Sequence, residues 1–300
     1  MLQKFLTIIS IALSLSSCAN AQKNYTNDKP AYVIYNKEGK QVNYTTLLNG
    51  LKQGDVVLFG EQHNDPISHW LELSLLKDLH QEKRNITLGS EIWESDQQII
   101  IDEFIEDKEM SMKSFLEYTR QWPNFTTDYK AMLQYAKDHS IPVLASNVPR
   151  RYSSLVSTRG IAMLDSISEE AKSFLPPLPL HIDLTQEFYD EDVANVFKQV
   201  SMMNSSSISN LVKAQALKDA TMAYHIVESC KKNQFVYHFN GEMHSAKHAA
   251  IVYYISHYNK DIDVKTVSVL KQKDIHYLEE ANKRADFVVV VPNDMTVSYE

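Results

Sequence analysis

Short apolar runs of strand length alternate with segments of helical periodicity along most of this 300-residue chain. Buried strands are predicted at residues 56–59, 86–88, 142–145, 235–239, 264–269 and 287–291. The spacing of apolar residues predicts helices at 66–83, 96–105, 128–139, 208–231 and 245–257. Strands that are apolar throughout and alternate with helices are typical of a parallel sheet covered on both faces. The sequence therefore predicts an α/β fold whose sheet is mostly parallel and flanked by helices.

The middle of the chain departs from this alternation. Residues 150–232 carry helical patterns only, interrupted by Pro-Pro-Leu-Pro at 176–179. The strands that follow are too few to form a sheet of their own. This favours a single domain at 32–300 with a helical insertion that caps the sheet. A short hairpin from 32–35 to 41–44 is expected to lead into that domain.

The first residues have the form of a secretory signal. Lys4 precedes an apolar run at 5–15 that is too short to span a bilayer as a permanent helix. The run ends in Leu-Ser-Ser-Cys, which is similar to the bacterial lipobox, in which the cysteine becomes the lipidated first residue. We expect residues 1–17 to be a lipoprotein signal peptide, Cys18 to carry lipid and residues 18–31 to be a polar tether. The alternative is a cysteine that lies by chance near an ordinary cleavage site.

Composition limits the partners of the mature protein. The chain has 30 basic and 38 acidic residues and a formal net charge of −8, and Lys4 is the only charged residue in the signal. A protein this negative binds nucleic acid and anionic lipid poorly through charge alone. We therefore expect no nucleic-acid partner, and a membrane contact made by acyl chains. Cys230 is the one cysteine left if Cys18 is lipidated, so no disulfide framework is expected.

The sequence Gly-Glu-x-His occurs twice, at 60–63 and 241–244, each time after a predicted strand and before a predicted helix. A single copy is explained by structure alone, with a glycine for the turn, a glutamate near a helix start and a histidine on the rim. Two copies at matching positions favour function, because the ends of parallel strands lie at one edge of the sheet, where ligand crevices form. The residues expected to meet there are Glu61, His63, Glu242 and His244.

Further charged residues follow the other predicted strands. Glu91 and Glu94 follow the second strand, and Arg150 follows the third. Each has a structural explanation as a helix cap or a solvated rim, but together they make an unusually charged edge to build for stability alone. The predicted crevice residues are Glu61, His63, Glu91, Glu94, Arg150, Glu242 and His244.

These side chains are suited to hydrolysis. His63 and His244, with Glu61 or Glu242, could hold a divalent ion or polarise a water. A glutamate could take the proton of that water, and Arg150 could stabilise an oxyanion. Nitrogen and carboxylate ligands suit zinc, manganese or cobalt without choosing among them, and the sequence has no His-Glu-x-x-His zinc signature. His248, four residues after His244, could share a metal on a helix face, although a surface position is the more common outcome.

The predicted helix at 208–231 presents Gln215, Asp219 and Met222 on one face. Polar groups on a buried face need specific hydrogen bonds, so they either orient the crevice residues, which we favour, or fasten the cap to the sheet. Packing in the core or cap, rather than contact with a cofactor, is the interpretation of four other residues: His69, Trp70, Met202 and Met203.

Together these motifs resemble the ChaN family of haem-binding uptake lipoproteins, in the Tiki superfamily. The resemblance rests on the two Gly-Glu-x-His motifs, Glu91 and Glu94 between them, the stretch 147–151 and the lipobox, and it covers residues 33–291. It implies haem as the cofactor, a haem-receptor system as a partner, and a homodimer that holds haem between its protomers.

The resemblance also implies contacts to haem from this crevice. His63 and His244 would lie beside the cofactor, and a tyrosine would ligate the iron. Tyr118, Tyr152 and Tyr189 lie in the helical region that could cap the crevice, and no motif selects one of them.

The Tiki superfamily also includes metal-dependent proteases and resembles the erythromycin esterases, which implies hydrolysis by the same residues. The leading hypothesis is a haem-binding lipoprotein for iron uptake, the alternative is a metal-dependent hydrolase, and a third is a structural lipoprotein with a vestigial crevice. We expect an extracytoplasmic protein anchored to a bacterial membrane. The outer membrane is favoured, because Ala19 and Asn20 after Cys18 include no aspartate of the kind associated with inner-membrane retention.

Overall fold

The computed structural model describes residues 29–83, 85–183, 188–195, 198, 205–232, 234–279 and 284–299. The predicted signal peptide, the lipidated Cys18, most of the tether, and the pair Met202 and Met203 lie outside these described residues. Residues Ala31–Glu300 form one compact unit. No helix among the described residues combines the length and the apolar character that a membrane crossing needs.

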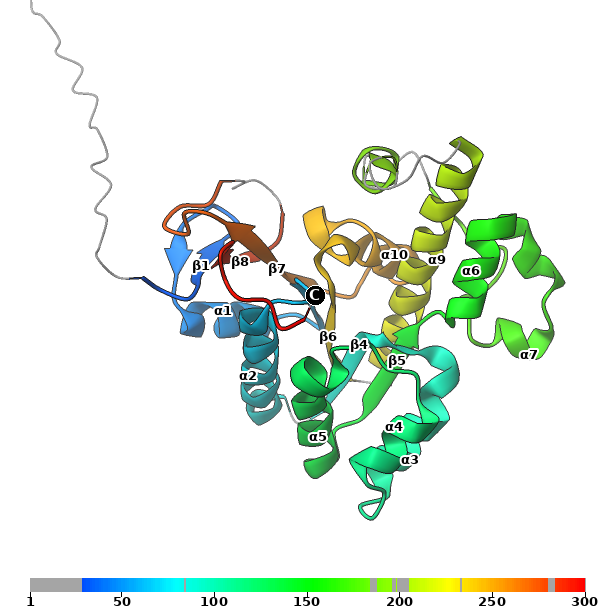
Figure 1. The fold of residues 1–300 in the computed structure, drawn as a ribbon, viewed down its shortest axis with the longest axis horizontal. Coiled ribbons are helices and arrows are strands. Elements are labelled where there is room, and N and C mark those ends of the chain that lie inside the picture. The colour runs from blue at the N-terminus through cyan, green and yellow to red at the C-terminus, as the bar shows by residue number, and fades with distance from the viewer. Residues whose placement is uncertain are drawn as a thin grey trace, which may run out of the picture. The chain divides into compact units, whose positions relative to one another are not determined.

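An eight-stranded sheet forms the centre of this unit, in the order β2-β1-β8-β7-β3-β6-β4-β5 (Figure 1). From β8 to β5 all neighbouring strands are parallel, whereas β1 is antiparallel to both β8 and β2. The mostly parallel α/β sheet predicted from the sequence is thus confirmed. The strands are β1 (Val33–Asn36), β2 (Gln41–Val42), β3 (Val56–Glu61), β4 (Ile86–Glu94), β5 (Val143–Asn147), β6 (Phe235–Gly241), β7 (Val264–Gln272) and β8 (Phe287–Pro292).

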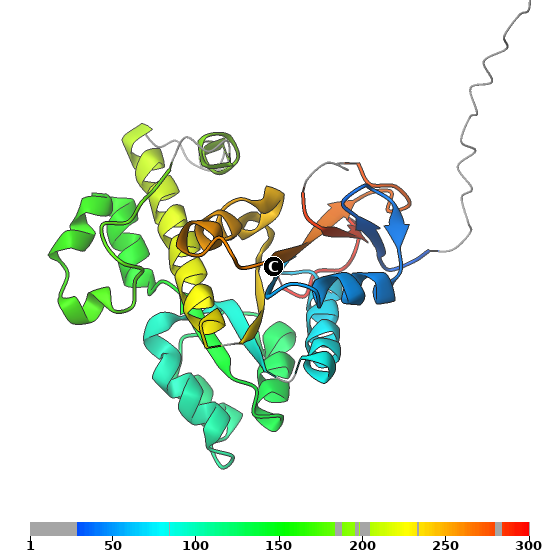
Figure 2. The same ribbon diagram turned by 180° about the vertical axis from the view of Figure 1, so that it is seen from behind.

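Helices cover both faces of the sheet because the central strands are apolar on both faces. Val57 and Phe59 of β3 point into one hydrophobic core, and Val56 and Leu58 point into another. Figures 1 and 2 show the two groups of helices on opposite sides of the sheet. The first core is covered by α1 (Tyr44–Leu51), α2 (Pro66–Glu82), α3 (Gln98–Glu106), α4 (Met112–Tyr118) and α5 (Lys130–Asp138). The second is covered by α9 (Ser205–Cys230) and α10 (Ile251–Tyr258).

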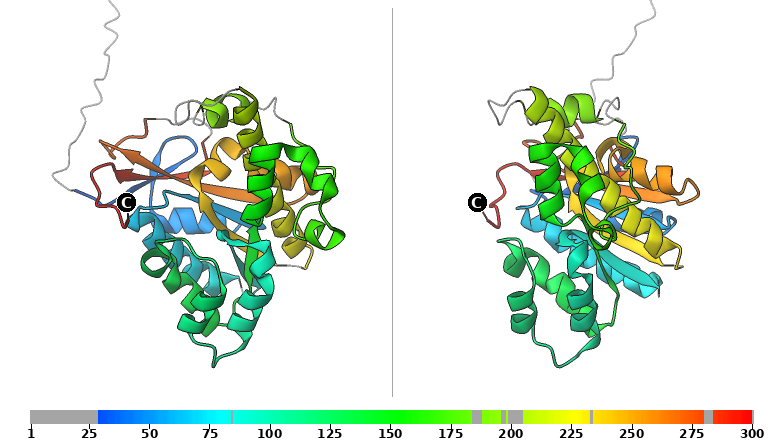
Figure 3. Two further views of the ribbon diagram at one scale, coloured as in Figure 1. Left: turned by 45° about the vertical axis from the view of Figure 1, so that its right-hand side comes forward. Right: turned by 90° about the vertical axis from the view of Figure 1, so that its right-hand side faces the viewer.

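The described part of residues 150–232 contains helices and no strand, and it packs a small core of its own. Val156, Leu164 and Leu217 are buried there together, and α6 lies against α9 (Figure 3). The elements before α9 are α6 (Arg150–Arg159), η3 (Ile161–Ser166), α7 (Glu169–Lys172) and η4 (Phe188–Val193).

Two elements at the functional edge differ from their predicted bounds. Strand β4 continues to Glu94, beyond the predicted end at residue 88, with an irregular register against β5 between Ser90 and Glu94. The helix predicted at 245–257 begins only at Ile251, after two 3₁₀ turns, η5 (Glu242–His244) and η6 (Ala246–His248).

The late start of α10 has a local cause. Lys247 and His248 both have positive φ, and the Lys247 backbone N–H donates to the Arg284 carbonyl at 2.7 Å. This contact holds the chain in turns, so His244 and His248 do not share a helix face. The idea that they bind one metal from successive helical turns is therefore wrong. His248 instead lies 3.5 Å from Asp286 at the surface.

Candidate functional site

The two Gly-Glu-x-His motifs lie side by side. Strands β3 and β6 are parallel neighbours, and Glu61 pairs with Gly241 in their register. The motifs therefore leave the sheet at the same edge, and they share a pocket of about 320 Å³. The residues that line it are Glu61, Gln62, His63, Val193, Gln215, Gly241, Glu242, Met243 and His244.

Each motif's glycine is packed against the other motif. A Cβ built on Gly60 would lie 3.1 Å from the Glu242 Cα, and one built on Gly241 would lie 2.8 Å from Cε1 and Nε2 of His63. Gly241 has φ −53°, which any residue can adopt. Close approach between the two segments, and not a turn, is therefore the reason for the glycines.

His244 is buried between two carboxylates. Its Nε2 lies 3.1 Å from Glu91 Oε1, its Nδ1 contacts Asp219 Oδ1, and the Gln215 amide lies 3.0 Å from Nε2. Burial alone would lower the pKa of His244, but Glu91 and Asp219 raise it to about 10. Although burial alone would raise the pKa of Glu91, His244 holds it well below its usual range. The site thus contains a buried imidazolium between two anions.

Helix α9 supplies part of this arrangement. Gln215 and Asp219 both contact His244, and Tyr189 donates its hydroxyl to the second oxygen of Asp219 at 2.7 Å. The polar face of this helix was expected either to orient the crevice residues or to fasten the cap to the sheet. These contacts match the first role. Met222 is fully buried in the core beneath.

His63 differs from His244 in exposure. Its Nδ1 donates to Glu61 Oε1 at 2.7 Å, and its side chain is 45% exposed. The ring of Trp122 stands perpendicular to the imidazole, with 4.8 Å between the two ring centroids. The described residues provide no hydrogen bond to its Nε2. Burial favours the neutral ring, but Glu61 and Glu91 raise the pKa of His63. His63 is therefore an accessible imidazole that is oriented by a buried carboxylate.

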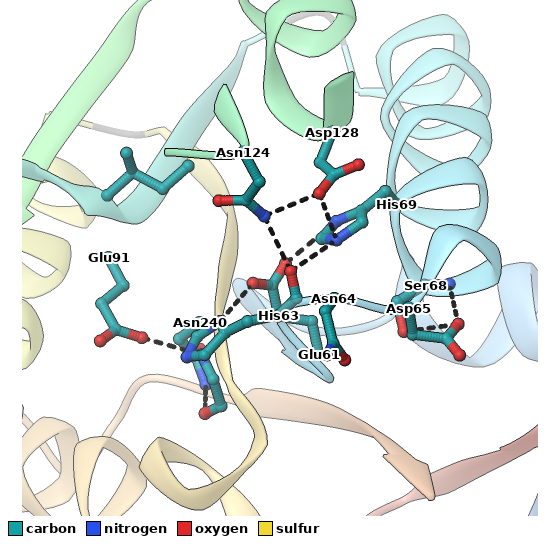
Figure 4. A network of polar contacts seen from close by, with 12 residues as sticks. Glu61, His63, Asn64, Asp65, Ser68, His69, Glu91, Asn124, Asp128 and Asn240 are labelled. Atoms are coloured by element: carbon teal, nitrogen blue, oxygen red, sulfur yellow. Dashed lines mark hydrogen bonds and ion pairs between the residues drawn. The ribbon is translucent and has the colours of Figure 1, made fainter. Parts of the chain in front are cut away.

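Next to His63 lies a second group of polar side chains, and Figure 4 shows some of them, including Asp65, His69 and Asp128. Asp65 caps α2 by accepting from the Ser68 backbone N–H at 2.9 Å, which fixes the start of the helix just after the first motif. One turn into α2, His69 Nδ1 lies 3.1 Å from Glu72 Oε2 and 3.5 Å from Glu61 Oε2. Within the described part of the chain, Glu61, His69 and Glu72 are the group whose ligand atoms all lie within 4.8 Å of one another.

Most of this second group was not predicted from the sequence. His69 was expected to pack in the core or cap. Glu72 and Tyr129, whose hydroxyl donates to Glu61 Oε1 at 2.5 Å, were not among the predicted site residues. The available signal was the position of Glu72, because it follows Leu71 and precedes Leu75 on the apolar side of α2. A glutamate at a position that is predicted to be buried needs a partner.

The glutamate of the second motif points elsewhere. Glu242 accepts from Ser268 Oγ at 2.5 Å and from Arg284 Nε at 2.7 Å. The two motifs are therefore alike in sequence and backbone position but differ in the partners of their carboxylates.

Glu94 and Arg150 form a separate ion-pair cluster. Arg150 Nε lies 2.5 Å from Glu94 Oε1, Arg120 Nη2 lies 2.9 Å from Glu94 Oε2, and the Arg150 side chain is 60% exposed. Neither Glu94 nor Arg150 lines the pocket that holds His63. Of the seven predicted crevice residues, the structure brings together Glu61, His63, Glu91, Glu242 and His244 around the motif pair.

The three candidate haem tyrosines lie in different environments. Tyr189 is fully buried and bonded to Asp219, and Tyr152 is 9% exposed, whereas Tyr118 at the end of α4 is 70% exposed. Tyr299, which was not among the predicted candidates, is also exposed, and its backbone carbonyl accepts from Asn64 beside His63 at 3.5 Å.

The predicted metal ligands His63, His244 and Glu61 do not converge on one point. Both nitrogens of His244 face Glu91 and Asp219, whereas His63 and Glu61 bond to each other. Metal binding by this particular set stays a prediction.

Comparisons with solved structures agree with this fold. The structure is similar to that of ChaN of Campylobacter jejuni, described as showing cofacial haem binding, with a TM-score of 0.69 and 18% identity over 87% of this chain and 96% of that one. It also matches an erythromycin esterase, an EreC mutant in its open conformation, with a TM-score of 0.46 and 11% identity over 86% of this chain and 83% of that one.

Sequence comparisons give the family. A search of curated proteins finds no significant match. The family model described as haem-binding uptake, Tiki superfamily, ChaN, matches residues 47–255, which include both Gly-Glu-x-His motifs and helix α9. The chain therefore belongs to the ChaN family of haem-binding uptake proteins in the Tiki superfamily.

Proposed function

We propose that this protein binds haem at the pocket between the two motifs and serves haem or iron uptake. The observation that carries the proposal is His63, a half-exposed imidazole held by the buried Glu61 carboxylate in a chain of the ChaN family. The side chains beside it suit a flat, largely apolar ligand, because Trp122 stands edge-on to His63, and Met243 and Val193 line the pocket.

The size of the pocket supports a shared haem. A volume of about 320 Å³ lies at the lower end of the roughly 300–1,000 Å³ of pockets that enclose a drug-sized ligand. A macrocycle would therefore lie across the mouth and leave one face outward. We propose that a second copy of the chain covers this face, which gives a haem-bound homodimer. The cofacial haem binding named for the Campylobacter jejuni protein supports this arrangement.

Tyr118 and Tyr299 are the candidates that we propose for the iron ligand. The family resemblance implies a tyrosine, and Tyr152 and Tyr189 are too buried to reach a haem at the surface. Tyr118 is separated by only three residues from Trp122, which packs on His63, and Tyr299 lies beside Asn64. When bound, haem would supply the iron that a tyrosinate ligates. The chain supplies the apolar wall and the oriented imidazole.

A hemin titration tests the proposal. Purified mature protein should shift the Soret band of hemin to saturation at a fixed stoichiometry, and His63→Ala should weaken binding by at least about tenfold. Tyr118→Phe or Tyr299→Phe should change the absorption spectrum of the bound haem. Tyr277→Phe, at a similarly exposed tyrosine, is the matched control. A spectrum identical to that of free hemin would remove the haem hypothesis.

We propose further that the protein is a lipoprotein, anchored through Cys18 to the outer membrane on its extracytoplasmic side, and a partner of a haem-receptor system. The sequence Leu-Ser-Ser-Cys at 15–18 supports the anchor. Cys18→Ser should move the protein from the membrane fraction to the soluble fraction and abolish labelling with a radioactive fatty acid. Unchanged membrane association would remove the lipid anchor.

A metal-dependent hydrolase remains the second candidate. The observation that favours it is the buried imidazolium of His244 between Glu91 and Asp219, next to the accessible His63. Hydrolysis of peptides or esters that is stimulated by manganese, cobalt or zinc and abolished by His63→Ala would support this function. If the wild-type protein cleaves nothing in a broad panel, the hydrolase loses its support.

A further inference from the structure

We propose that Glu61, His69 and Glu72 form a buried site for a divalent transition-metal cation beneath the pocket. The three side chains are almost fully buried, with 2%, 6% and 0% exposure. One ligand atom from each lies within 4.8 Å of the other two. This site is distinct from the set His63, His244 and Glu61 that the sequence suggested, and it does not depend on haem binding.

One nitrogen of His69 is bound to the backbone. Its Nε2 lies 3.1 Å from the backbone oxygen of His63, as Figure 4 shows. A carbonyl oxygen can only accept, so Nε2 carries the proton and donates it. Nδ1 then faces the carboxylates of Glu61 and Glu72, and it is the nitrogen that a metal would bind in place of a proton. Metal-binding histidines typically have this arrangement, with the second nitrogen donating to a backbone carbonyl.

Two carboxylate oxygens of this group are buried without a hydrogen-bond partner. Glu61 Oε1 accepts from His63 and Tyr129, but Glu61 Oε2 has no hydrogen bond. Glu72 Oε1 is likewise buried without one. Glu61 Oε2 and Glu72 Oε1 are therefore buried acceptors without a hydrogen-bond donor among the described residues. Such a group is costly to bury unless a cation or protons fill the gap.

The wider surroundings are also anionic. Asp65 and Asp128 lie close to this group, and Asp128 Oδ2 is 3.6 Å from His69 Nε2. Among the described residues, the ion pairs and hydrogen bonds of these four carboxylates involve histidine, tyrosine, serine, asparagine and backbone groups, and no lysine or arginine. A bound cation would supply the missing positive charge.

Of the two ligand separations measured from His69 Nδ1, one matches the spacing around a small transition-metal ion and the other is slightly shorter. His69 Nδ1 lies 3.1 Å from Glu72 Oε2 and 3.5 Å from Glu61 Oε2. Tetrahedral ligands at about 2.0–2.2 Å from zinc are separated by about 3.3–3.6 Å. One imidazole and two carboxylates are ligands that zinc, cobalt and manganese accept. Glu61 also lines the pocket, so the site adjoins it.

The ion would act on the pocket through Glu61. One oxygen of this carboxylate would bind the metal, while the other keeps its bonds to His63 and Tyr129. Metal binding would thereby fix the orientation of the His63 ring. His69 and Glu72 are positioning residues in this scheme, because they act on His63 only through Glu61.

The test is a titration of chelator-treated, haem-free mature protein with Co²⁺ and with Zn²⁺, followed by calorimetry and by the visible spectrum of Co²⁺. We expect about one equivalent of either metal to bind. Loss of an outer-shell partner costs roughly 10–100-fold in metal affinity. Loss of a ligand in His69→Gln or Glu72→Gln should cost at least that. His248→Gln, at a half-exposed histidine outside the site, is the matched control and should bind normally.

A second measurement uses only the wild-type protein, so it does not require the variants to fold. In the Co²⁺ form of the wild-type protein, proton NMR should show one strongly shifted exchangeable signal from the His69 Nε2–H, which is protected by the His63 carbonyl. Failure of the wild type to bind either metal would overturn the proposal, as would full binding by both ligand variants. An infrared band from a protonated carboxyl group in the metal-treated protein, lost in Glu72→Gln, would show that protons fill the site. Because hemin is absent from these assays, their failure is separate from a failure of haem binding.

Discussion

Gly241 lies against the imidazole of His63, so closely that a Cβ on Gly241 would come within 2.8 Å of the ring. A Cβ on Gly60 would likewise lie 3.1 Å from the Cα of Glu242. The Gly-Glu-x-His motifs thus interlock, and each glycine makes room for the other motif. The repeated motif is explained by this mutual packing of parallel neighbours as much as by the chemistry of its histidines.

Replacement of Gly241 by alanine should disturb both stability and the position of His63. Overpacking of a dense site costs typically about 1–3 kcal/mol. We therefore expect Gly241→Ala to lower the free energy of unfolding in urea by this amount and to weaken hemin binding. The double variant Gly241→Ala, His63→Ala removes the ring that the methyl group meets, and it should be less destabilised than the sum of the two single variants. Additive effects would contradict this explanation.

Loss of the His244 imidazole should be among the most damaging single changes at this edge. His244→Ala would leave Glu91 and Asp219 buried without their shared cation. Removal of one partner of a buried ion pair costs about 3–5 kcal/mol. His248→Ala is the control, because its pair with Asp286 is at the surface and is worth about 0–1 kcal/mol. Equal losses of unfolding free energy in the two variants would refute a buried imidazolium.

The same group predicts how stability depends on pH. The pKa of His244 is raised from 6.5 to about 10, so its stabilising contribution is fully present below pH 6.5 and is lost as the pH rises through about 10. The pKa of Glu91 is lowered, so its contribution is present above pH 4.5 and is lost as the pH falls through the lower value of the folded state. The advantage of wild type over His244→Gln should therefore be largest near pH 5–6.5 and shrink towards pH 10. Urea unfolding of both proteins across this range is the measurement, and an advantage that grows with pH would contradict the assignment.

The sequence predicted the sheet well, because buried parallel strands are apolar throughout and their ends must meet at one edge. It placed Glu61, His63, Glu242 and His244 together for that reason. It did not predict the separation of Glu94 and Arg150 from the pocket, because that depends on the irregular register between β4 and β5. A register shift of this kind leaves no pattern in a single sequence.

The second group of polar side chains, around Glu61, could not be found from sequence motifs, for a different reason. His69 and Glu72 lie on a helix that otherwise packs on the sheet, and Tyr129 comes from the π-helical turn η2 (Phe125–Tyr129) before α5. Only the three-dimensional packing of α2 and this turn onto β3 shows that their polar atoms face Glu61. The start of α10 was missed similarly, since Lys247 bonds to a carbonyl that is distant in sequence.

The hydroxyl of Tyr129 provides a test of how Glu61 is held. It donates to the Glu61 oxygen that also accepts from His63, and the tyrosine is fully buried. Hydrogen bonds to charged groups contribute roughly 1.5–3 kcal/mol, so Tyr129→Phe should lower the unfolding free energy by about that much. Tyr135→Phe on α5 is the control, because its hydroxyl contacts His80 in a partly exposed position and its loss should cost less than about 1.5 kcal/mol.

The same variant should also change the pocket. With Tyr129 replaced by phenylalanine, the Glu61 carboxylate keeps its bond to His63 but loses its other donor on Oε1, so it gains freedom to rotate. His63 would then be less firmly oriented, and hemin affinity should fall several-fold in Tyr129→Phe while Tyr135→Phe binds normally. Both variants could bind hemin like the wild type while Tyr129→Phe is clearly destabilised. That result would show that Tyr129 contributes only to the stability of the fold. It would also show that hemin binding does not depend on the orientation of His63 by Glu61.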